Sequence, residues 1–569
     1  MRLKPRYGVN MGKAKKNILF IMYDQLRWDY LSCAGHPHLD TPNFDWLASQ
    51  GVRFNQAFAQ SAVCGASRMS TYTGRYVSSH GAAWNGFPLK VGELTIGDHL
   101  RKLGMDAVLL GKTHMRADVE GMERLGVDPD SVIGVRVAEC GFDPYIRDEG
   151  MEVVGPDGRY SDIRSPYNDY LWSIGYESLN PWHDHANSAV DDSLNVMSGF
   201  AMKNSALPAN IIEKDSETPW LTSEMINWLE KRKPDDPPWC VHLSFIKPHW
   251  PYIAPKPYNS MYNGQDIIPP VATEEERRNS HPVYRQYQDG VIAEGWSKEE
   301  VRERAIPAYM GLIKQCDDQL GRLLDYLRKS DRLQNTMIIL TSDHGDNLGD
   351  HHLGEKDMMH DSSIRVPLIV YDPSPDADKT RGLVCDALVE GIDLAATFVE
   401  FHGGEIALKN LDHILEGRSL MPWLKGQKPS WREFAVSEYD YSMTPYRAQL
   451  GVSVKDARWT VLVDHRWKFT HFEGGFRPML FDRINDPEET IDLAEGSTPE
   501  IIDALELMYR RLASFRARVC QRTTLSSDEI ISKTGASRRR GVVLGMYDEG
   551  EAPELLDAYG KAVKKNYTQ

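Results

Sequence analysis

The stretch Asn17-Ile18-Leu19-Phe20-Ile21-Met22-Tyr23-Asp24 decides the fold class of this chain. A short apolar run of this kind, ended by a charged residue, predicts a strand that is buried on both faces of a sheet. Similar runs return along the chain at residues 107–112, 240–246, 336–343 and 366–371. Helical patterns alternate with them, at residues 43–50, 93–103, 223–233, 308–329 and 391–401.

Strands that alternate with helices predict an α/β fold, in which a large mixed, mostly parallel sheet is sandwiched by helices. In such folds ligands bind at the carboxyl ends of the strands. Polar side chains stand at or just past the ends of the predicted strands, at Asp24, Lys112, His249 and Asp343. The sequence therefore predicts that these side chains share one site.

The pattern divides the chain into a large part, a smaller part and a tail. Residues 16–430 carry the α/β pattern, and within them the Gly-, Asp- and Trp-rich residues 115–220 predict long loops over the mouth of the site. Residues 431–520 predict an α+β subdomain, because short strand patterns precede a helical one there. The tail, residues 521–569, fits either an arm that joins copies of the chain into a dimer or tetramer, or a loose tail.

The bulk composition argues against several classes of function. The formal net charge of -16 disfavours nucleic acid and anionic membranes as partners, and leaves open a small anionic substrate in a local cationic pocket. The 7 cysteines are widely spaced and contain no CxxC pair, which favours a reducing compartment. Residues 1–16 are basic without an apolar core, so we expect a cytoplasmic protein without an export signal or a membrane span.

Two pairs of residues predict a metal site. Asp24-Gln25 closes the first strand, and Asp343-His344 closes a late one. Two carboxylates, an amide oxygen and an imidazole at neighbouring strand ends can hold a divalent cation, although either pair alone fits a turn cap or a polar gap equally well. Because the amide and the imidazole are softer than carboxylates, Mn²⁺ suits this set as well as Ca²⁺.

The run Cys64-Gly65-Ala66-Ser67-Arg68, followed by Thr73-Gly74-Arg75, resembles the sulfatase signature Cys-x-Pro/Ala-Ser-Arg with Thr-Gly-Arg. The resemblance covers roughly residues 16–515, including Thr41-Pro42-Asn43 and Asp486-Pro487-Glu488-Glu489. The chain is similar to the type I, formylglycine-dependent sulfatases of the alkaline phosphatase superfamily. It resembles in particular the branch that holds the arylsulfatases and the phosphonate monoester hydrolases.

In that family the signature cysteine is oxidised to formylglycine, and the hydrate of this aldehyde is an oxygen nucleophile on the metal. The resemblance implies this role for Cys64, with the metal held between it and Asp24, Gln25, Asp343 and His344. A metal lowers the pKa of a bound hydroxyl and polarises the ester oxygens. The second hydroxyl then lets the covalent intermediate collapse and release sulfate.

The resemblance also implies roles for the cationic side chains and for one imidazole. Arg68, Lys112 and Lys356 bind the sulfuryl oxygens, where preorganised charge contributes most to catalysis. His249 stands in a Pro-His-x-Pro element and protonates the leaving oxygen, which suits a side chain that titrates near neutral pH.

The element Gly111-Lys112-Thr113-His114 bears on the choice of substrate. Residues two apart in an extended segment point the same way, so Lys112 and His114 can both face the leaving group. Sulfatases carry Gly-Lys-x-His here, whereas the phosphonate monoester hydrolases carry Tyr and Thr. The resemblance therefore implies hydrolysis of sulfate monoesters of aryl or small organic alcohols, in which His114 assists breakdown of the intermediate and Asn85 contacts the substrate.

Two alternatives stay open. One is a phosphonate monoester or phosphodiester hydrolase that uses the same nucleophile and metal. The other is a metal-stabilised binding module in which Cys64 remains a thiol. Ala66 stands where the commonest signature has Pro, and the enzymes that oxidise the cysteine read this position. A formylglycine-generating or equivalent maturation enzyme is therefore an expected partner.

Overall fold

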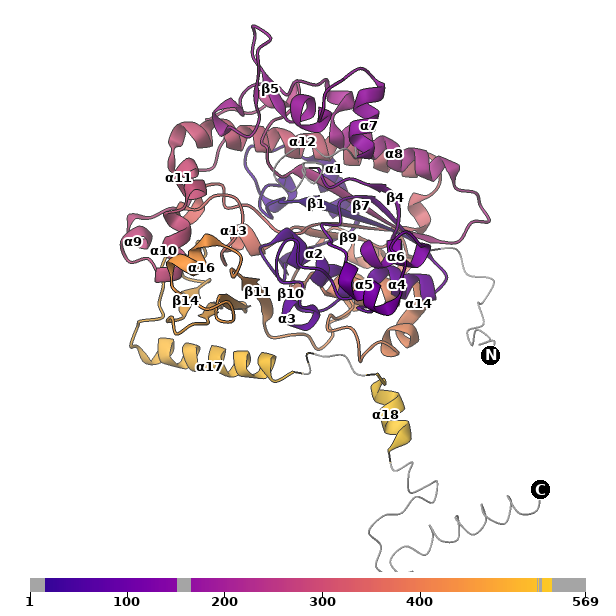
Figure 1. Ribbon diagram of the computed structural model, residues 1–569. Helices are drawn as coiled ribbons and strands as arrows, with labels where there is room; N and C mark the ends of the chain where they lie inside the picture. Colours follow the sequence, from indigo (N-terminus) through magenta and orange to yellow (C-terminus); the bar gives the residue numbers. More distant parts are fainter. Residues whose placement is uncertain (1–15, 151–164, 519, 521–523, 535–569) are drawn as a thin grey trace, which may run out of the picture.

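The computed structural model describes residues 16–150, 165–518, 520 and 524–534. Its centre is an eight-stranded sheet in the order β10-β2-β9-β8-β1-β7-β3-β4 (Figure 1). β1 lies between β7 and β8 and runs parallel to both, whereas β9 is antiparallel to its two neighbours. The predicted large, mixed and mostly parallel sheet is therefore confirmed. Its strands are β1 (Asn17–Asp24), β2 (Val52–Phe58), β3 (Asp106–Gly111), β4 (Asp143–Arg147), β7 (Trp239–Pro248), β8 (Thr336–Ser342), β9 (Leu368–Tyr371) and β10 (Leu383–Glu390).

Helices cover both faces of this sheet, which is why every residue of β1 is buried. Ile21 faces a core that is completed by α1 (Pro42–Gln50), α8 (Glu217–Lys231) and α12 (Glu299–Lys329). Phe20 faces the opposite core, completed by α2 (Cys64–Thr73), α4 (Ile96–Lys102) and α14 (Asp393–Lys409). Figure 1 shows these two layers above and below the sheet. Each large apolar side chain buried in this way contributes about 1.5–3 kcal/mol to stability.

The interpretation of residues 115–220 as long loops is wrong for much of the segment. It contains α5 (Val119–Leu125), α6 (Val132–Ala138), β4, α7 (Pro166–Ser173) and a hairpin of β5 (Ser188–Val190) and β6 (Val196–Ser198). β4 is an edge strand in which Ile146 is the one buried residue among exposed and half-buried ones, so it carries no apolar periodicity that a sequence pattern would reveal. Residues 151–164 of the segment lie outside the described residues.

The C-terminal part holds the small antiparallel sheet and the helix that the pattern predicts. The strands, in order, are β11 (Ala435–Asp440), β12 (Arg458–Val463), β13 (Trp467–Phe472) and β14 (Met479–Asp482). α17 (Pro499–Arg516) packs on one face of this sheet through an apolar cluster. A backbone hydrogen bond from Glu438 to Gln60 links β11 to the large domain, and the boundary at residue 430 stays a prediction.

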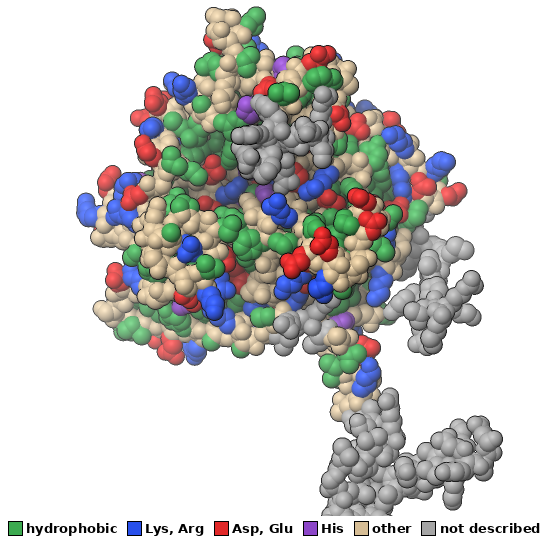
Figure 2. Space-filling view, viewed as in Figure 1, with side chains coloured by type: hydrophobic (Ala, Val, Ile, Leu, Met, Phe, Trp, Pro, Cys, Tyr) green, Lys and Arg blue, Asp and Glu red, His purple; other side chains and the backbone are tan. Residues whose placement is uncertain are grey.

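Shorter helices complete the described chain. They are α3 (Val77–His80), α9 (Glu274–Arg278), α10 (Pro282–Gln288), α11 (Val291–Ser297), α13 (Asp361–Ile364), α15 (Met421–Leu424), α16 (Pro445–Gln449) and α18 (Ser527–Lys533). Apart from residues 524–534, the predicted arm at 521–569 lies outside the described residues. Within the described ranges no helix is long and apolar enough to cross a membrane. Acidic and basic side chains are interspersed over the face seen in Figure 2.

Candidate active site

The strand ends place the predicted polar residues around the N-terminus of α2. Asp24 is the last residue of β1, and Asp343 follows β8 directly. Lys112 follows Gly111, the last residue of β3, and a side chain at Gly111 would lie 2.0 Å from the carbonyl oxygen of Ser244 in β7. Only glycine allows this close approach of the two strands, which brings Lys112 to the ends of β1 and β8.

Four buried side chains converge on one point beside this helix. The ligand-type atoms of Asp24, Cys64, Asp343 and His344 all lie within 4.8 Å of one another. The Cys64 sulfur lies 3.0 Å from His344 Nε2 and 3.9 Å from Asp24 Oδ1. His344 Nε2 lies 3.8 Å from Asp343 Oδ1. Two carboxylates and an imidazole at such distances form a donor set that suits a divalent cation.

Arg68 lies behind the two carboxylates and is fully buried. Its Nε donates to Asp343 Oδ2 at 2.8 Å, and its Nη2 donates to Asp24 Oδ2 at 3.1 Å. Nη1 bonds to Ser244 Oγ and to the Lys112 carbonyl. The Lys112 ammonium also lies 2.8 Å from Asp24 Oδ2. Each carboxylate therefore gives Oδ2 to a cation. Oδ1 of Asp24 lies 3.8 Å from His344 Nε2, and Oδ1 of Asp343 also accepts the backbone N–H groups of Gln25 and His344.

The Gln25 amide is oriented by two residues that the sequence pattern did not single out. Gln25 Nε2 donates to Asp346 Oδ2 at 2.6 Å and to the Tyr252 hydroxyl at 3.1 Å. The Tyr252 hydroxyl donates to the same carboxylate oxygen at 2.6 Å. This network turns Gln25 Oε1 toward the site, where it lies 3.5 Å from Lys356 Nζ. Asp346 stands three residues after Asp343, and this proximity in sequence is the signal that could have found it.

Cys64 is the first residue of α2 and is fully buried. The next backbone N–H, that of Gly65, donates to Asn85 Oδ1 at 2.8 Å, so Asn85 holds the start of the helix. Burial raises the pKa of the Cys64 thiol, but the Lys356 ammonium and the His344 imidazole outweigh burial and hold the pKa well below its usual range. The role of Asn85 as a substrate contact stays a prediction.

Lys356 and His249 form a second pair beside Cys64. Lys356 Nζ lies 3.2 Å from the Cys64 sulfur and 2.9 Å from His249 Nε2. His249 Nδ1 lies 2.7 Å from the carbonyl oxygen of Trp250, which places a proton on Nδ1 and leaves Nε2 to accept from Lys356. Burial and the Lys356 charge lower the pKa of His249.

Glu149 shapes the segment that carries Lys112 and His114. Its carboxylate accepts backbone N–H bonds from Thr113 at 2.8 Å and from His114 at 3.0 Å. The His114 ring lies beside Cys64 and helps to lower the pKa of that thiol, and its Nδ1 is shielded from solvent without a hydrogen-bond partner among the described residues. Glu149 lies far from any recognisable motif, so sequence reasoning had no signal for it.

Comparison with known proteins places this site in a family. Residues 16–403 match the sulfatase family model, and residues 349–517 match that of the C-terminal region of N-sulphoglucosamine sulphohydrolase. The multifunctional alkaline phosphatase superfamily protein PehA of Trinickia caryophylli is 30% identical, over 84% of this chain and 91% of PehA. An arylsulfatase of Clostridium perfringens is 28% identical, over 84% of this chain and 90% of that protein.

Solved structures agree with these matches. The phosphonate monoester hydrolase SpPMH of Silicibacter pomeroyi superposes with a TM-score of 0.76 at 27% identity, over 88% of this chain and 95% of that one. The chain belongs to the sulfatase family, a family of sulfuric ester hydrolases within the alkaline phosphatase superfamily.

Proposed function

We propose that this enzyme hydrolyses sulfate monoesters of aryl or small organic alcohols at the site around residue 64. The observation that carries the proposal is the position of Cys64 at the start of a buried helix. Asp24, Asp343 and His344 lie beside it, and Lys356 Nζ lies 3.2 Å from its sulfur. A nucleophile in this place meets a cation-binding cluster and a fixed ammonium at once, which suits attack on an anionic ester.

The donor set fits the metal and the modified residue that the family implies. Oδ1 of each carboxylate lies 3.8 Å from His344 Nε2, and the oriented Gln25 Oε1 lies 3.5 Å from Lys356 Nζ in the same site. The His114 side chain hydrogen-bonds Cys64. When bound there, Mn²⁺ or Ca²⁺ polarises the ester oxygens, and a formylglycine derived from Cys64 supplies a hydroxyl as the nucleophile.

The cations of the chain divide into two roles in this proposal. Lys112 and Lys356 bind the anionic oxygens of the ester, because their ammonium groups lie on the side of Cys64 and Asp24. Arg68 instead orients Asp24 and Asp343, because its Nε and Nη2 donate hydrogen bonds to their Oδ2 atoms. This differs from a direct contact with the sulfuryl group, which the resemblance implied for Arg68.

The proton for the leaving oxygen belongs to His249. Its Nδ1 is anchored on a carbonyl oxygen, so Nε2 is the atom that donates to the leaving group. Lys356 lies 2.9 Å from Nε2 and orients the imidazole, and it keeps its own proton because the neighbouring Cys64 and Asp24 raise its pKa. His114, whose side chain hydrogen-bonds residue 64, takes the proton that is lost when the intermediate breaks down.

A phosphonate monoester hydrolase is the second candidate, favoured by the likeness to SpPMH and by the name of PehA. Steady-state kinetics with p-nitrophenyl sulfate and with a p-nitrophenyl phenylphosphonate discriminates the two. We expect the larger kcat/KM for the sulfate, and a preference of several orders of magnitude for the phosphonate rejects the sulfate proposal. The double substitution Lys112→Tyr, His114→Thr should lower the sulfate kcat/KM by roughly 10²-fold or more and the phosphonate kcat/KM by less, because it removes charge from beside the ester oxygens.

Intact-mass analysis of the peptide that contains Cys64 tests the nucleophile separately. We expect the aldehyde or its hydrate in an active preparation. A fully active enzyme whose Cys64 peptide carries only a thiol contradicts the formylglycine proposal, and it does so whichever ester is preferred.

A further inference from the structure

Two histidines close the segment that carries Lys356 into a loop. His351 and His360 stand on either side of Lys356 in the sequence, and their rings stack with centroids 3.6 Å apart and an interplanar angle of 13°. Both side chains are buried. The two ends of the segment are therefore held against each other by a flat ring contact, independently of the chain between them.

Each ring of the stack is bonded to a glutamate from another part of the fold. His351 Nδ1 lies 2.6 Å from Glu276 Oε1 in α9, and His360 Nδ1 lies 3.3 Å from Glu489 Oε2 beyond β14. We call these four residues the histidine clasp. Lys468 of β13 forms an ion pair with Glu489 and so fixes one end of the clasp to the C-terminal sheet.

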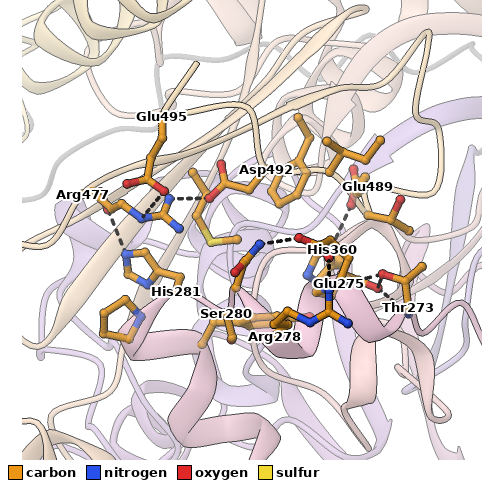
Figure 3. Close-up of a pocket in the computed structure, with 18 residues that line it drawn as sticks. Thr273, Glu275, Arg278, Ser280, His281, His360, Arg477, Glu489, Asp492 and Glu495 are labelled. Atoms are coloured by element: carbon orange, nitrogen blue, oxygen red, sulfur yellow. Dashed lines mark hydrogen bonds and ion pairs between the residues drawn. The ribbon is translucent and has the colours of Figure 1, made fainter. Parts of the chain in front are cut away.

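A cavity of about 820 Å³ lies along one side of the clasp and is lined by Glu276, His360 and Glu489. Figure 3 shows His360 and Glu489 in its wall, joined by their hydrogen bond. Lys356 is not among the residues that line this cavity. The clasp thus faces a space of its own, and its contacts run to α9 and the C-terminal sheet.

The backbone inside the loop adopts conformations that need external support. His352, Glu355, Asp357 and Met358 have φ of 60°, 52°, 80° and 62° without being glycine. Left-handed conformations of such residues persist only where the surrounding structure determines them. Asn347 holds the middle of the loop, because its backbone N–H donates to the Glu355 carbonyl at 2.6 Å and its Nδ2 donates to the Lys356 carbonyl at 3.3 Å. The clasp adds a constraint at the two ends of the loop.

Lys356 is the residue in this loop whose position matters for chemistry. A lysine side chain is long and flexible, so the place of its Nζ depends on where the backbone starts it. Nζ must lie between Cys64 and His249, at 3.2 Å and 2.9 Å. We propose that the histidine clasp is the positioning device that delivers Lys356 to the site, and that it acts on turnover through Lys356. This inference rests on the proposed function of the same site.

A double-mutant cycle on p-nitrophenyl sulfate tests the proposal. His360→Ala removes the ring and its bond to Glu489, and we expect kcat to fall about tenfold or more with a smaller change in KM, because misplacement of a catalytic group acts mainly on the chemical step. In a Lys356→Met background the same substitution should change kcat by less than about twofold. Equal losses in both backgrounds, or no loss in the first, overturn the proposal.

His281→Ala is the matched control for a merely structural effect. His281 is buried, stacks on Phe472 with centroids 4.2 Å apart and lines the same cavity, but it lies outside the loop. We expect it to lower Tm in the same way as His360→Ala while kcat stays near the wild-type value. His360→Phe keeps a flat ring and loses the bond to Glu489, and its kcat should lie between those of wild type and His360→Ala.

Hydrogen exchange separates failure of the clasp from failure of the proposed function. His360→Ala should speed amide exchange in residues 352–358, and His281→Ala should not, because only the former opens the loop. If the wild-type enzyme turns over the phosphonate ester alone, the cycle is run on that ester. If the wild-type enzyme turns over neither ester, the proposed function has failed. In that case, amide exchange in residues 352–358 that is the same in His360→Ala as in the wild type overturns the clasp proposal as well.

Discussion

Arg68 decides how the two carboxylates of the site are presented. It is fully buried between Asp24 and Asp343 and takes one oxygen of each, so that the other oxygens face His344. Two buried carboxylates side by side repel each other, and a planar guanidinium can pair with both at once. Burial raises the pKa of Asp24, but the charge of Lys112, reinforced by His249 and Arg68, holds it well below its usual range.

Arg68→Met should therefore be strongly destabilising. We expect the free energy of unfolding of the metal-free protein to fall by about 3–5 kcal/mol, the range for a buried ion pair that loses one partner. Denaturant unfolding measures this change. Adding Asp343→Asn to the Arg68→Met variant should recover part of the loss, since it removes one of the uncompensated charges, and a further loss of similar size would contradict the pairing.

Strand β7 places a buried imidazole against α2, the helix that begins with Cys64. His242 lies in the middle of β7, where its Nε2 meets the Tyr72 hydroxyl of α2 at 2.8 Å. Its Nδ1 lies 3.3 Å from the Phe20 carbonyl oxygen in β1. Burial, reinforced by the charge of Arg68, lowers the pKa of His242 to about 3, so the imidazole is neutral in the folded protein at neutral pH.

This pKa predicts acid destabilisation with a definite sign. A histidine in the unfolded chain titrates near pH 6.5. Between about pH 6.5 and 3, His242 is therefore protonated in the unfolded state and neutral in the folded state. The contribution of His242 is fully present above about pH 6.5 and falls by about 1.4 kcal/mol per pH unit below it. His242→Gln keeps a donor and an acceptor but cannot titrate, and its Tm should depend less steeply on pH between 6.5 and 4. Parallel Tm profiles for the two proteins would contradict this assignment.

At the scale of the whole molecule the site is a junction of segments far apart in the chain. Asp24 ends β1, Cys64 begins α2, and Asp343 and His344 follow β8. The loop that carries Lys356 is tied to the C-terminal sheet through Glu489 and Lys468. A ligand that binds these residues together must stabilise the fold as a whole.

Metal removal should therefore lower the thermal stability of the entire protein. Treatment with a chelator should lower Tm in one cooperative step, and Mn²⁺ or Ca²⁺ at 100 times its dissociation constant should restore about 2.7 kcal/mol. Calorimetry with and without metal measures the shift. Asp24→Asn is the control, because it weakens the donor set and should reduce the shift, whereas an equal shift in that variant places the metal elsewhere.

The sequence by itself determined the frame of this molecule. Buried strands such as β1 can be predicted from the sequence, because a short apolar run ended by a polar residue is typical of a central strand in an α/β fold. The positions of Asp24, Lys112 and Asp343 at strand ends follow from this prediction. The signature around Cys64 likewise stands in one continuous stretch. These features are local, and a local pattern is readable without the rest of the chain.

Only the tertiary structure decided what holds these residues in place. Four features depend on partners that the fold brings together. They are the edge strand β4, the hydrogen bond from Gln25 to Asp346, the bonds from the backbone of residues 113 and 114 to Glu149, and the stacking of His351 on His360. Such contacts leave no periodicity in the chain, because a buried polar group needs a partner at hydrogen-bond distance and not a partner at a given spacing in the sequence. The sequence thus indicates which groups are the candidates for the chemistry, and the packing determines where each of them points.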